Sequence, residues 1–121
     1  MLMGSVPVEV LKSKKITKVT ASEEEVLLEC SDGSCYKMVH YQDCCEHVHL
    51  TNPEEALKLQ DAMVLLASES NPEDKPLNEY DDSYTWTFFT IVTDNGVHIL
   101  KWYGTSNGYY SESVDFIDAT V

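Results

Sequence analysis

The chain has 121 residues, of which 43% are hydrophobic, and its formal net charge is −13 at pH 7. This length and apolar fraction suit one domain over residues 1–121, with a core that needs no structural metal. The charge argues against direct binding to nucleic acid or to an anionic membrane, because phosphate contacts depend on clustered basic side chains. With no bilayer-spanning apolar run and no signal peptide pattern, we expect a cytoplasmic protein.

The charges are unevenly distributed along the chain. From residue 19 onward there are four lysines and twenty acidic residues, and the whole chain has no arginine. A phosphate site would therefore depend on lysine, backbone amides or helix ends. Acidity serves solubility, but it also attracts a basic protein surface, and we expect the partner to carry one.

Strand patterns dominate the first half of the sequence. Residues 1–14 have no sustained period and are expected to be a loosely held leader or an edge strand. From Ile16 apolar residues alternate on both sides of a turn at residues 31–34, where Asp-Gly is typical of a tight hairpin. Residues 44–50 alternate again, which predicts a further strand.

A short helix and an acidic loop follow this strand. Asn52 and Pro53 are typical of a helix start, and the helix should end near Gln60. The apolar residues 63–67 fit either a continued helix or a buried strand. Residues 69–82 hold six acids and one lysine, which predicts a mobile acidic loop.

The last third of the sequence predicts a three-stranded meander. Residues 84–92 are rich in β-branched and aromatic side chains, Asn95-Gly96 predicts a turn, and residues 97–103 and 109–117 supply two more strands. We therefore expect an α+β fold that is mostly antiparallel. It should contain two meanders, with six to eight strands in all, curled as a half-barrel or sandwich with one short helix.

No motif identifies an enzyme or a cofactor site. The cysteines, at positions 30, 35, 44 and 45, are expected to be free thiols, because a well-filled core without a signal peptide pattern is typical of a reducing compartment. His47 and His49 share a face, but the paired spacing of structural zinc sites is absent, so no metal is expected. Cysteine catalysis would need an orienting partner and an oxyanion loop, and neither is recognisable.

Polar and aromatic residues suggest a recognition surface instead. Neighbouring residues of a strand face opposite sides, so one of Tyr109 and Tyr110, and one of Trp102 and Tyr103, should point outward. The predicted binding residues are Gln42, Asp43, Cys44, Glu46, Trp102, Ser106, Asn107, Tyr109, Tyr110 and Glu112. The acidic loop should face the partner through Glu73, Asp74, Glu79, Asp81 and Asp82.

Three motifs, at residues 42–46, 84–88 and 102–114, together resemble a family of small uncharacterised proteins of bacteriophages and prophages. The resemblance covers residues 16–117 and implies a short phage accessory protein without an assigned activity. Such an origin implies a counter-defence inhibitor, of the anti-CRISPR kind, or a host-takeover inhibitor that binds a basic host protein. The alternatives are a sponge for a small signalling nucleotide, built from the first and third motifs, and a small hydrolase. A homo-oligomer is compatible with each.

Overall fold

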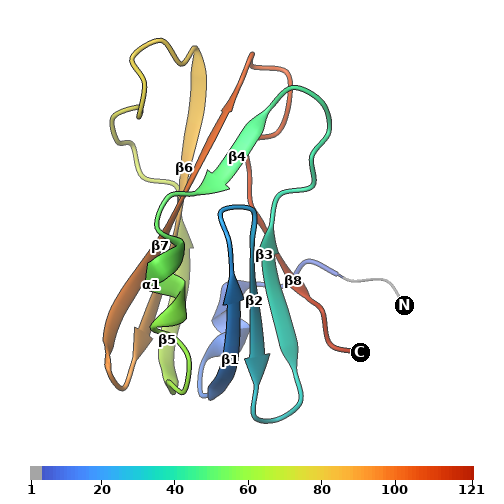
Figure 1. Cartoon of the computed structure of the whole chain (residues 1–121), viewed down its shortest axis with the longest axis vertical. Helices are drawn as coiled ribbons and strands as arrows, with labels where there is room; N and C mark the ends of the chain where they lie inside the picture. The colour runs from blue at the N-terminus through green and yellow to red at the C-terminus, as the bar shows by residue number, and fades with distance from the viewer. Residues whose placement is uncertain (1–3) are drawn as a thin grey trace.

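The computed structural model describes residues 4–121, which form two four-stranded antiparallel sheets (Figure 1). The first sheet has the order β1-β2-β3-β8, with strands Ile16–Ala21, Glu25–Cys30, Cys35–Val39 and Asp115–Asp118. The second has the order β4-β7-β6-β5, with strands His47–Leu50, Gly96–Ser106, Ser83–Thr93 and Val64–Ser70. Because β6 and β7 have 11 residues each, this long hairpin runs the height of the molecule.

The hairpins predicted from local turn signals are present. Strand β2 pairs with β3 across the Asp32-Gly33 turn. Gly33 has a φ of +89°, a region that favours glycine, and Asp32 accepts the Ser34 backbone N–H at 2.9 Å. Strands β6 and β7 pair along their whole length across Asn95-Gly96. Turn chemistry within a few residues therefore determined these pairings.

The beginning of the chain is more firmly held than predicted. Val8–Leu11 form a 3₁₀-helix, η1, and Val8 and Leu11 are buried in the core. Ser5 also forms a β-bridge with Ile117. The prediction of a loosely held leader is therefore wrong for these residues, because two apolar side chains fix the segment. Residues 1–3 of the predicted leader lie outside the described residues.

The predicted final meander is also corrected. Residues 107–114 form no strand, and β8 crosses to the first sheet, where it pairs with β3. Strand β4, in turn, begins at His47 instead of Cys44 and pairs with β7 in the second sheet. Each sheet is thus a three-stranded meander completed by one strand from the other half of the chain.

The short helix α1, Pro53–Leu57, starts where the sequence predicted. Asn52 does not cap it with its side chain, and instead accepts the Lys101 backbone N–H and donates to the Ile99 carbonyl. The ambiguous residues 63–67 belong mostly to strand β5, which extends through Glu69 into the predicted acidic loop. Among residues 4–121 no helix has the length and apolar character to cross a membrane.

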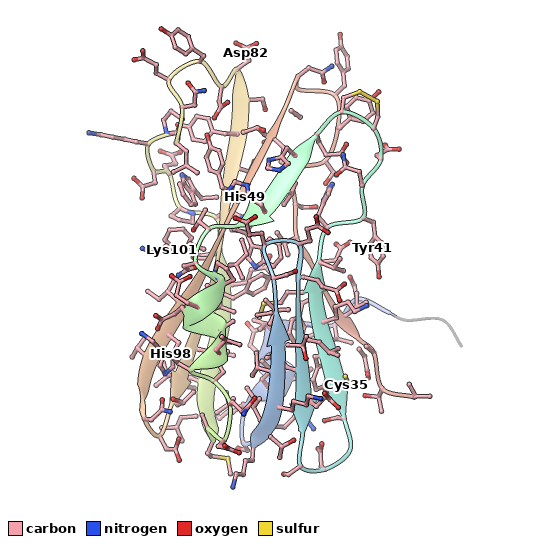
Figure 2. The ribbon with its side chains drawn as sticks, in the orientation of Figure 1. Cys35, Tyr41, His49, Asp82, His98 and Lys101 are labelled. Carbon is pink, nitrogen blue, oxygen red and sulfur yellow. A yellow bond between two sulfur atoms is a disulfide. The ribbon has the colours of Figure 1, made fainter. Side chains whose placement is uncertain are left out.

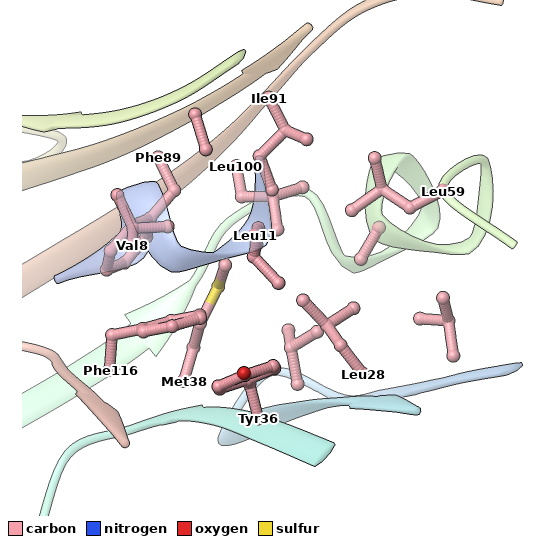
Figure 3. Close-up of a cluster of buried hydrophobic side chains, with 14 of the residues drawn as sticks. Val8, Leu11, Leu28, Tyr36, Met38, Leu59, Phe89, Ile91, Leu100 and Phe116 are labelled. Carbon is pink, nitrogen blue, oxygen red and sulfur yellow. The ribbon is translucent and has the colours of Figure 1, made fainter. Parts of the chain in front are cut away.

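The core lies between the two sheets and receives side chains from both of them and from η1 (Figure 3). Phe116 of β8 stacks on Tyr36 of β3 with ring centroids 5.5 Å apart, and lies 6.3 Å from Phe89 of β6. The predicted class, mostly antiparallel strands with one short helix, is confirmed. The sheets do not close into a barrel.

Candidate functional site

The loop between β3 and β4 folds around the carboxylate of Glu46, which is only 3% exposed. One oxygen of Glu46 accepts the Cys44 backbone N–H at 2.9 Å, and the other accepts that of Asp43 at 2.8 Å. The Gln42 amide donates to the Glu46 carbonyl at 2.6 Å. The Cys44 N–H is the main reason that the pKa of Glu46 is lowered to about 2. The first motif therefore uses its polar groups to build its own turn.

His40 connects this turn to the third motif. Its Nδ1 lies 2.7 Å from the Ser113 carbonyl and its Nε2 lies 2.7 Å from a Glu46 oxygen. The two ring nitrogens therefore contact groups from two different loops. The first and third motifs are thus adjacent in space, and His40 holds them together.

The cysteines next to Glu46 are not free thiols. Cys44 and Cys45 form a disulfide between adjacent residues, while Cys30 and Cys35 remain reduced. The prediction placed Cys44 and Cys45 in a strand, where their side chains would point apart. They lie in the turn before β4, where this alternation does not apply.

A second buried carboxylate, that of Glu112, lies on the core side of the β6–β7 hairpin. It accepts hydrogen bonds from the hydroxyls of Ser106 at 2.5 Å, Ser83 at 2.6 Å and Thr85 at 2.8 Å. Burial by itself raises the pKa of Glu112, but the three hydroxyls together outweigh it and lower the pKa. A Cβ on Gly104 would lie 2.5 Å from the Glu112 backbone oxygen, so this contact needs glycine.

Several predicted binding residues therefore have internal partners. Trp102 is completely buried in the core, which removes it from any surface site and corrects that prediction. Glu46 and Glu112 are buried and hydrogen bonded, as described above. Tyr109 is 90% exposed, as expected for one of the paired tyrosines. The predicted binding residues that stay exposed are Gln42, Asp43, Cys44, Asn107 and Tyr109, whereas Ser106 and Tyr110 are half-buried.

The second sheet carries a continuous aromatic surface on the side turned away from the core, here called the outer face. The strand register puts alternate residues of β4, β6 and β7 on it. Its aromatic and apolar members are His47, His49, Tyr84, Trp86, Phe88, Val92, Val97, Ile99 and Tyr103. The rings of Trp86 and Tyr103 lie 4.7 Å apart, and those of Tyr84 and Tyr103 lie 5.9 Å apart.

The acidic loop, residues 71–82, lies against the upper part of this outer face. The hydroxyl of Tyr103 donates to Asp81 at 2.6 Å and accepts the Leu77 backbone N–H at 3.1 Å. The hydroxyl of Tyr84 and the indole N–H of Trp86 donate to backbone carbonyls of the loop, both at 3.0 Å. Burial and the Asp81 bond raise the pKa of Tyr103 to about 12. Aromatic side chains therefore fix the path of the acidic loop.

The lower part of the outer face is open and apolar. Leu66, which pairs with Val92, is 56% exposed, and Val97 near the start of β7 is 58% exposed. The Lys101 ammonium lies 5.4 Å from the centroid of the Phe88 ring and borders this surface (Figure 2). An apolar strip beside an acidic loop has the composition of a protein interface, with an apolar centre and a charged rim.

A cleft of about 350 Å³ lies where the acidic loop meets β6. Loop residues Asn71, Pro72, Glu73 and Asp74 form one side, and Tyr84, Thr85 and Trp86 form the other. A second cleft, of about 360 Å³, is lined by residues of three segments: Glu23, Glu24, His40, Gln42, His47, Val48 and His49.

The histidines of the second cleft do not assemble a metal site. His47 and His49 share the outer face, as predicted, with ring centroids 4.9 Å apart. Burial and the neighbouring His47 lower the pKa of His49. Within residues 4–121 no group of three or more His, Cys, Asp or Glu side chains is arranged to hold a metal ion.

Comparison with known protein families identifies one match, described as a domain of unknown function (DUF7448), over residues 9–116. The chain belongs to the DUF7448 family. Searches of curated proteins and of solved structures found no match. Membership confirms the expectation of a family without an assigned function, whereas the phage origin stays a prediction. In this DUF7448 chain, Gly104 and Glu112 of the third motif are structural partners.

Sequence reasoning did not include Asn71, Tyr84, Trp86 and Tyr103 among the site residues. A signal for two of them was present, because Tyr84 and Trp86 are aromatic and share one face of a strand with Phe88. The contact between that face and the acidic loop has no local signal. It depends on hydrogen bonds that span as many as 26 residues.

Proposed function

We propose that this protein is a non-enzymatic binding protein that attaches to a basic surface of a partner protein through the outer face and the acidic loop. The observation that carries the proposal is their adjacency. Exposed apolar side chains such as Leu66 and Val97 lie on the same sheet face that Asp74 and Asp81 border. Apolar contacts supply affinity in such an interface, and the charges select the partner and speed association.

The electrostatics of the whole chain favour the same partner. The net charge of −13 produces a negative field that attracts basic surfaces and repels polyanions. A partner that normally holds nucleic acid presents clustered Lys and Arg, which an acidic loop could cover. Direct binding of this protein to nucleic acid is not part of the proposal.

In its biological setting, we propose a phage accessory protein that acts in the host cytoplasm as a counter-defence or host-takeover inhibitor. The support is the resemblance of the three motifs to phage and prophage proteins, together with the acidic surface. Binding to a basic nucleic-acid-handling complex would block the complex by competition for its nucleic acid site.

The nucleotide sponge is less well supported by the site. It was expected to use polar groups of the first and third motifs, where Glu46 and Glu112 are buried and bonded to neighbouring donors. The hydrolase alternative would draw on the same residues. Both alternatives stay predictions.

The test compares the binding of two charge variants to a basic partner. The tagged protein is incubated with host extract at increasing salt, captured proteins are identified, and one purified candidate is then titrated against the tagged protein. Binding should weaken steeply with salt, because exposed charge pairs are screened. Binding should also fail in a loop variant that neutralises Glu73, Asp74, Glu79, Asp81 and Asp82.

The matched control removes the same charge elsewhere. It neutralises five acids that lie outside the acidic loop and the outer face: Glu9, Glu24, Glu54, Asp61 and Asp94. The control should keep most of the affinity for the purified partner. If both variants lose affinity equally, the effect is one of net charge alone and the proposal is overturned. Binding that does not weaken with salt would also overturn it.

A further inference from the structure

The cleft between the acidic loop and β6 has the chemistry of a receptor for one cationic side chain. Its volume of about 350 Å³ falls at the small end of the ~300–1,000 Å³ usual for ligand pockets. Two carboxylates, those of Glu73 and Asp74, lie on the loop side. Aromatic residues Tyr84 and Trp86 lie on the strand side.

The aromatic side of this cleft is rigid. The Trp86 indole N–H is held by the Lys75 carbonyl and the Tyr84 hydroxyl by the Asp74 carbonyl, each at 3.0 Å. The same two rings pack on Tyr103, so neither turns without breaking a contact. Fixed aromatic rings bind a cation with little loss of their own conformational entropy.

The acidic side still has bonding capacity. Asp74 uses one oxygen to accept the Lys75 backbone N–H at 2.8 Å, which leaves its second oxygen available. In the part of the chain that the structure describes, no ion pair or hydrogen bond is formed by the Glu73 carboxylate. An arginine suits this combination best, because its planar guanidinium stacks on aromatic rings and donates to carboxylates with several N–H groups.

We infer that this cleft, lined by Glu73, Asp74, Tyr84 and Trp86, binds an arginine side chain that protrudes from the basic partner. The inference rests on the proposed function, since it names the anchor by which the acidic loop would recognise that partner. Charge complementarity selects the occupant, because a chain with net charge −13 disfavours a second copy of itself or an anionic ligand there.

The test is an NMR titration of the whole protein with three short neutralised-end peptides: acetyl-Gly-Gly-X-Gly-Gly-amide with arginine, lysine or norleucine at X. The two tryptophan indoles give an internal comparison, since Trp86 lines the cleft and Trp102 is buried in the core. The arginine peptide should shift the Trp86 indole signal in a saturable way and leave Trp102 unmoved. The lysine peptide should bind about threefold more weakly, and norleucine at least tenfold more weakly.

Two matched pairs of variants separate charge and ring contributions. Glu73→Gln should weaken the arginine peptide at least fivefold, whereas Glu79→Gln, in the same loop but outside the cleft, should change binding less than twofold. Tyr84→Leu should weaken it about threefold, whereas Tyr84→Phe keeps the ring and should stay within twofold. A fold check by the dispersion of the NMR spectrum accompanies each variant.

The outcomes distinguish this inference from the proposed function. An unmoved Trp86 signal, equal shifts with norleucine, or equal effects of Glu73→Gln and Glu79→Gln would overturn the arginine site. Salt-sensitive binding of a basic partner could still persist in that case, and the proposed function would stand without this anchor. If instead peptide binding is seen but no salt-sensitive partner binding occurs, the proposed function fails and the cleft is a cation site only.

Discussion

The lower and upper parts of the molecule are held together by different forces. In the lower part both sheets contribute apolar side chains, such as Leu28, Met38 and Phe89, to one hydrophobic core. At the upper end two loops instead carry buried carboxylates, those of Glu46 and Glu112. These carboxylates are surrounded by hydroxyl and N–H donors.

This difference explains why the most distinctive motifs of the sequence lie at the upper end. Apolar packing tolerates many substitutions of similar volume, so the lower core leaves only a periodic pattern in the sequence. A buried carboxylate needs particular donors at particular positions, so the upper end leaves specific motifs. The distinctive residues at 42–46 and 104–112 therefore stabilise the upper end of the fold, whereas the partner surface proposed above lies on the outer face.

The largest expected effect comes from breaking the apolar part. Phe89→Ala removes a completely buried ring near Phe116 and leaves a cavity, so the free energy of unfolding should fall by about 3–5 kcal/mol. Urea unfolding followed by tryptophan fluorescence measures this loss. A loss below 1 kcal/mol would show that the lower core does not carry the stability assigned to it.

A steric change at the upper end should cost less. Gly104→Ala places a Cβ 2.5 Å from the Glu112 backbone oxygen, so the segment that carries Glu112 must shift. Overpacking of this kind costs about 1–3 kcal/mol. The control is Gly4→Ala, where nothing lies within 4 Å of the added Cβ. If the two variants had the same unfolding curve, the close contact between Gly104 and Glu112 would be contradicted.

Acid should remove the stability that the buried Glu46 carboxylate contributes at the upper end. The folded-state pKa of Glu46 is lowered to about 2 by the Cys44 N–H and its other donors, so the ionised form stabilises the fold. That contribution is complete above the unfolded-state pKa, near 4.5, and is lost as pH falls toward 2. The unfolding free energy of the wild type should therefore decline through this range.

The Glu46→Gln variant sharpens the acid test, because it has no carboxylate to protonate at this position. It should be less stable than the wild type at pH 7, and its stability should change less between pH 4.5 and pH 2. Glu54→Gln, at an exposed position of α1, serves as the control and should follow the wild type. Parallel curves for Glu46→Gln and the wild type would exclude the buried carboxylate as the cause.

The smallest expected effect concerns the contact between the acidic loop and the outer face. Tyr103→Phe keeps the ring but removes the bonds to Asp81 and to the Leu77 N–H. The global free energy of unfolding should fall by about 1 kcal/mol, the usual net value of a hydrogen bond. Hydrogen exchange at Leu77 should accelerate much more, since only its local opening is affected. Unchanged exchange would mean that other contacts hold the loop.

Local signals in the sequence predicted the local part of the fold. Asp32-Gly33 and Asn95-Gly96 predicted their hairpins because a two-residue turn determines the pairing of the strands beside it. The exchange of β4 and β8 between the sheets was not predictable in this way, since no turn connects either strand to its neighbours in the sheet. The exchange is accompanied by contacts between distant segments, such as the hydrogen bonds that join His40 to Glu46 and, across 73 residues, to Ser113.

The candidate site was predictable only in part. The acidic loop was visible as a charge cluster, and the aromatic residues 84, 86 and 88 were visible as a strand face. Carboxylates such as Glu46 and Glu112 look the same in sequence whether they bind a partner or hold a fold together. Only their burial and donors distinguish the two roles.

The exchange of β4 and β8 has a consequence for how the chain folds. Neither half of the chain can complete a sheet by itself, because each sheet needs one strand from the other half. Strands that are distant in sequence must therefore pair during folding. We expect the chain to fold slowly, at the rates typical of all-β domains with high contact order. Two fragments separated between α1 and β5 should each stay largely unstructured and should fold only when mixed, each supplying the strand that the other lacks.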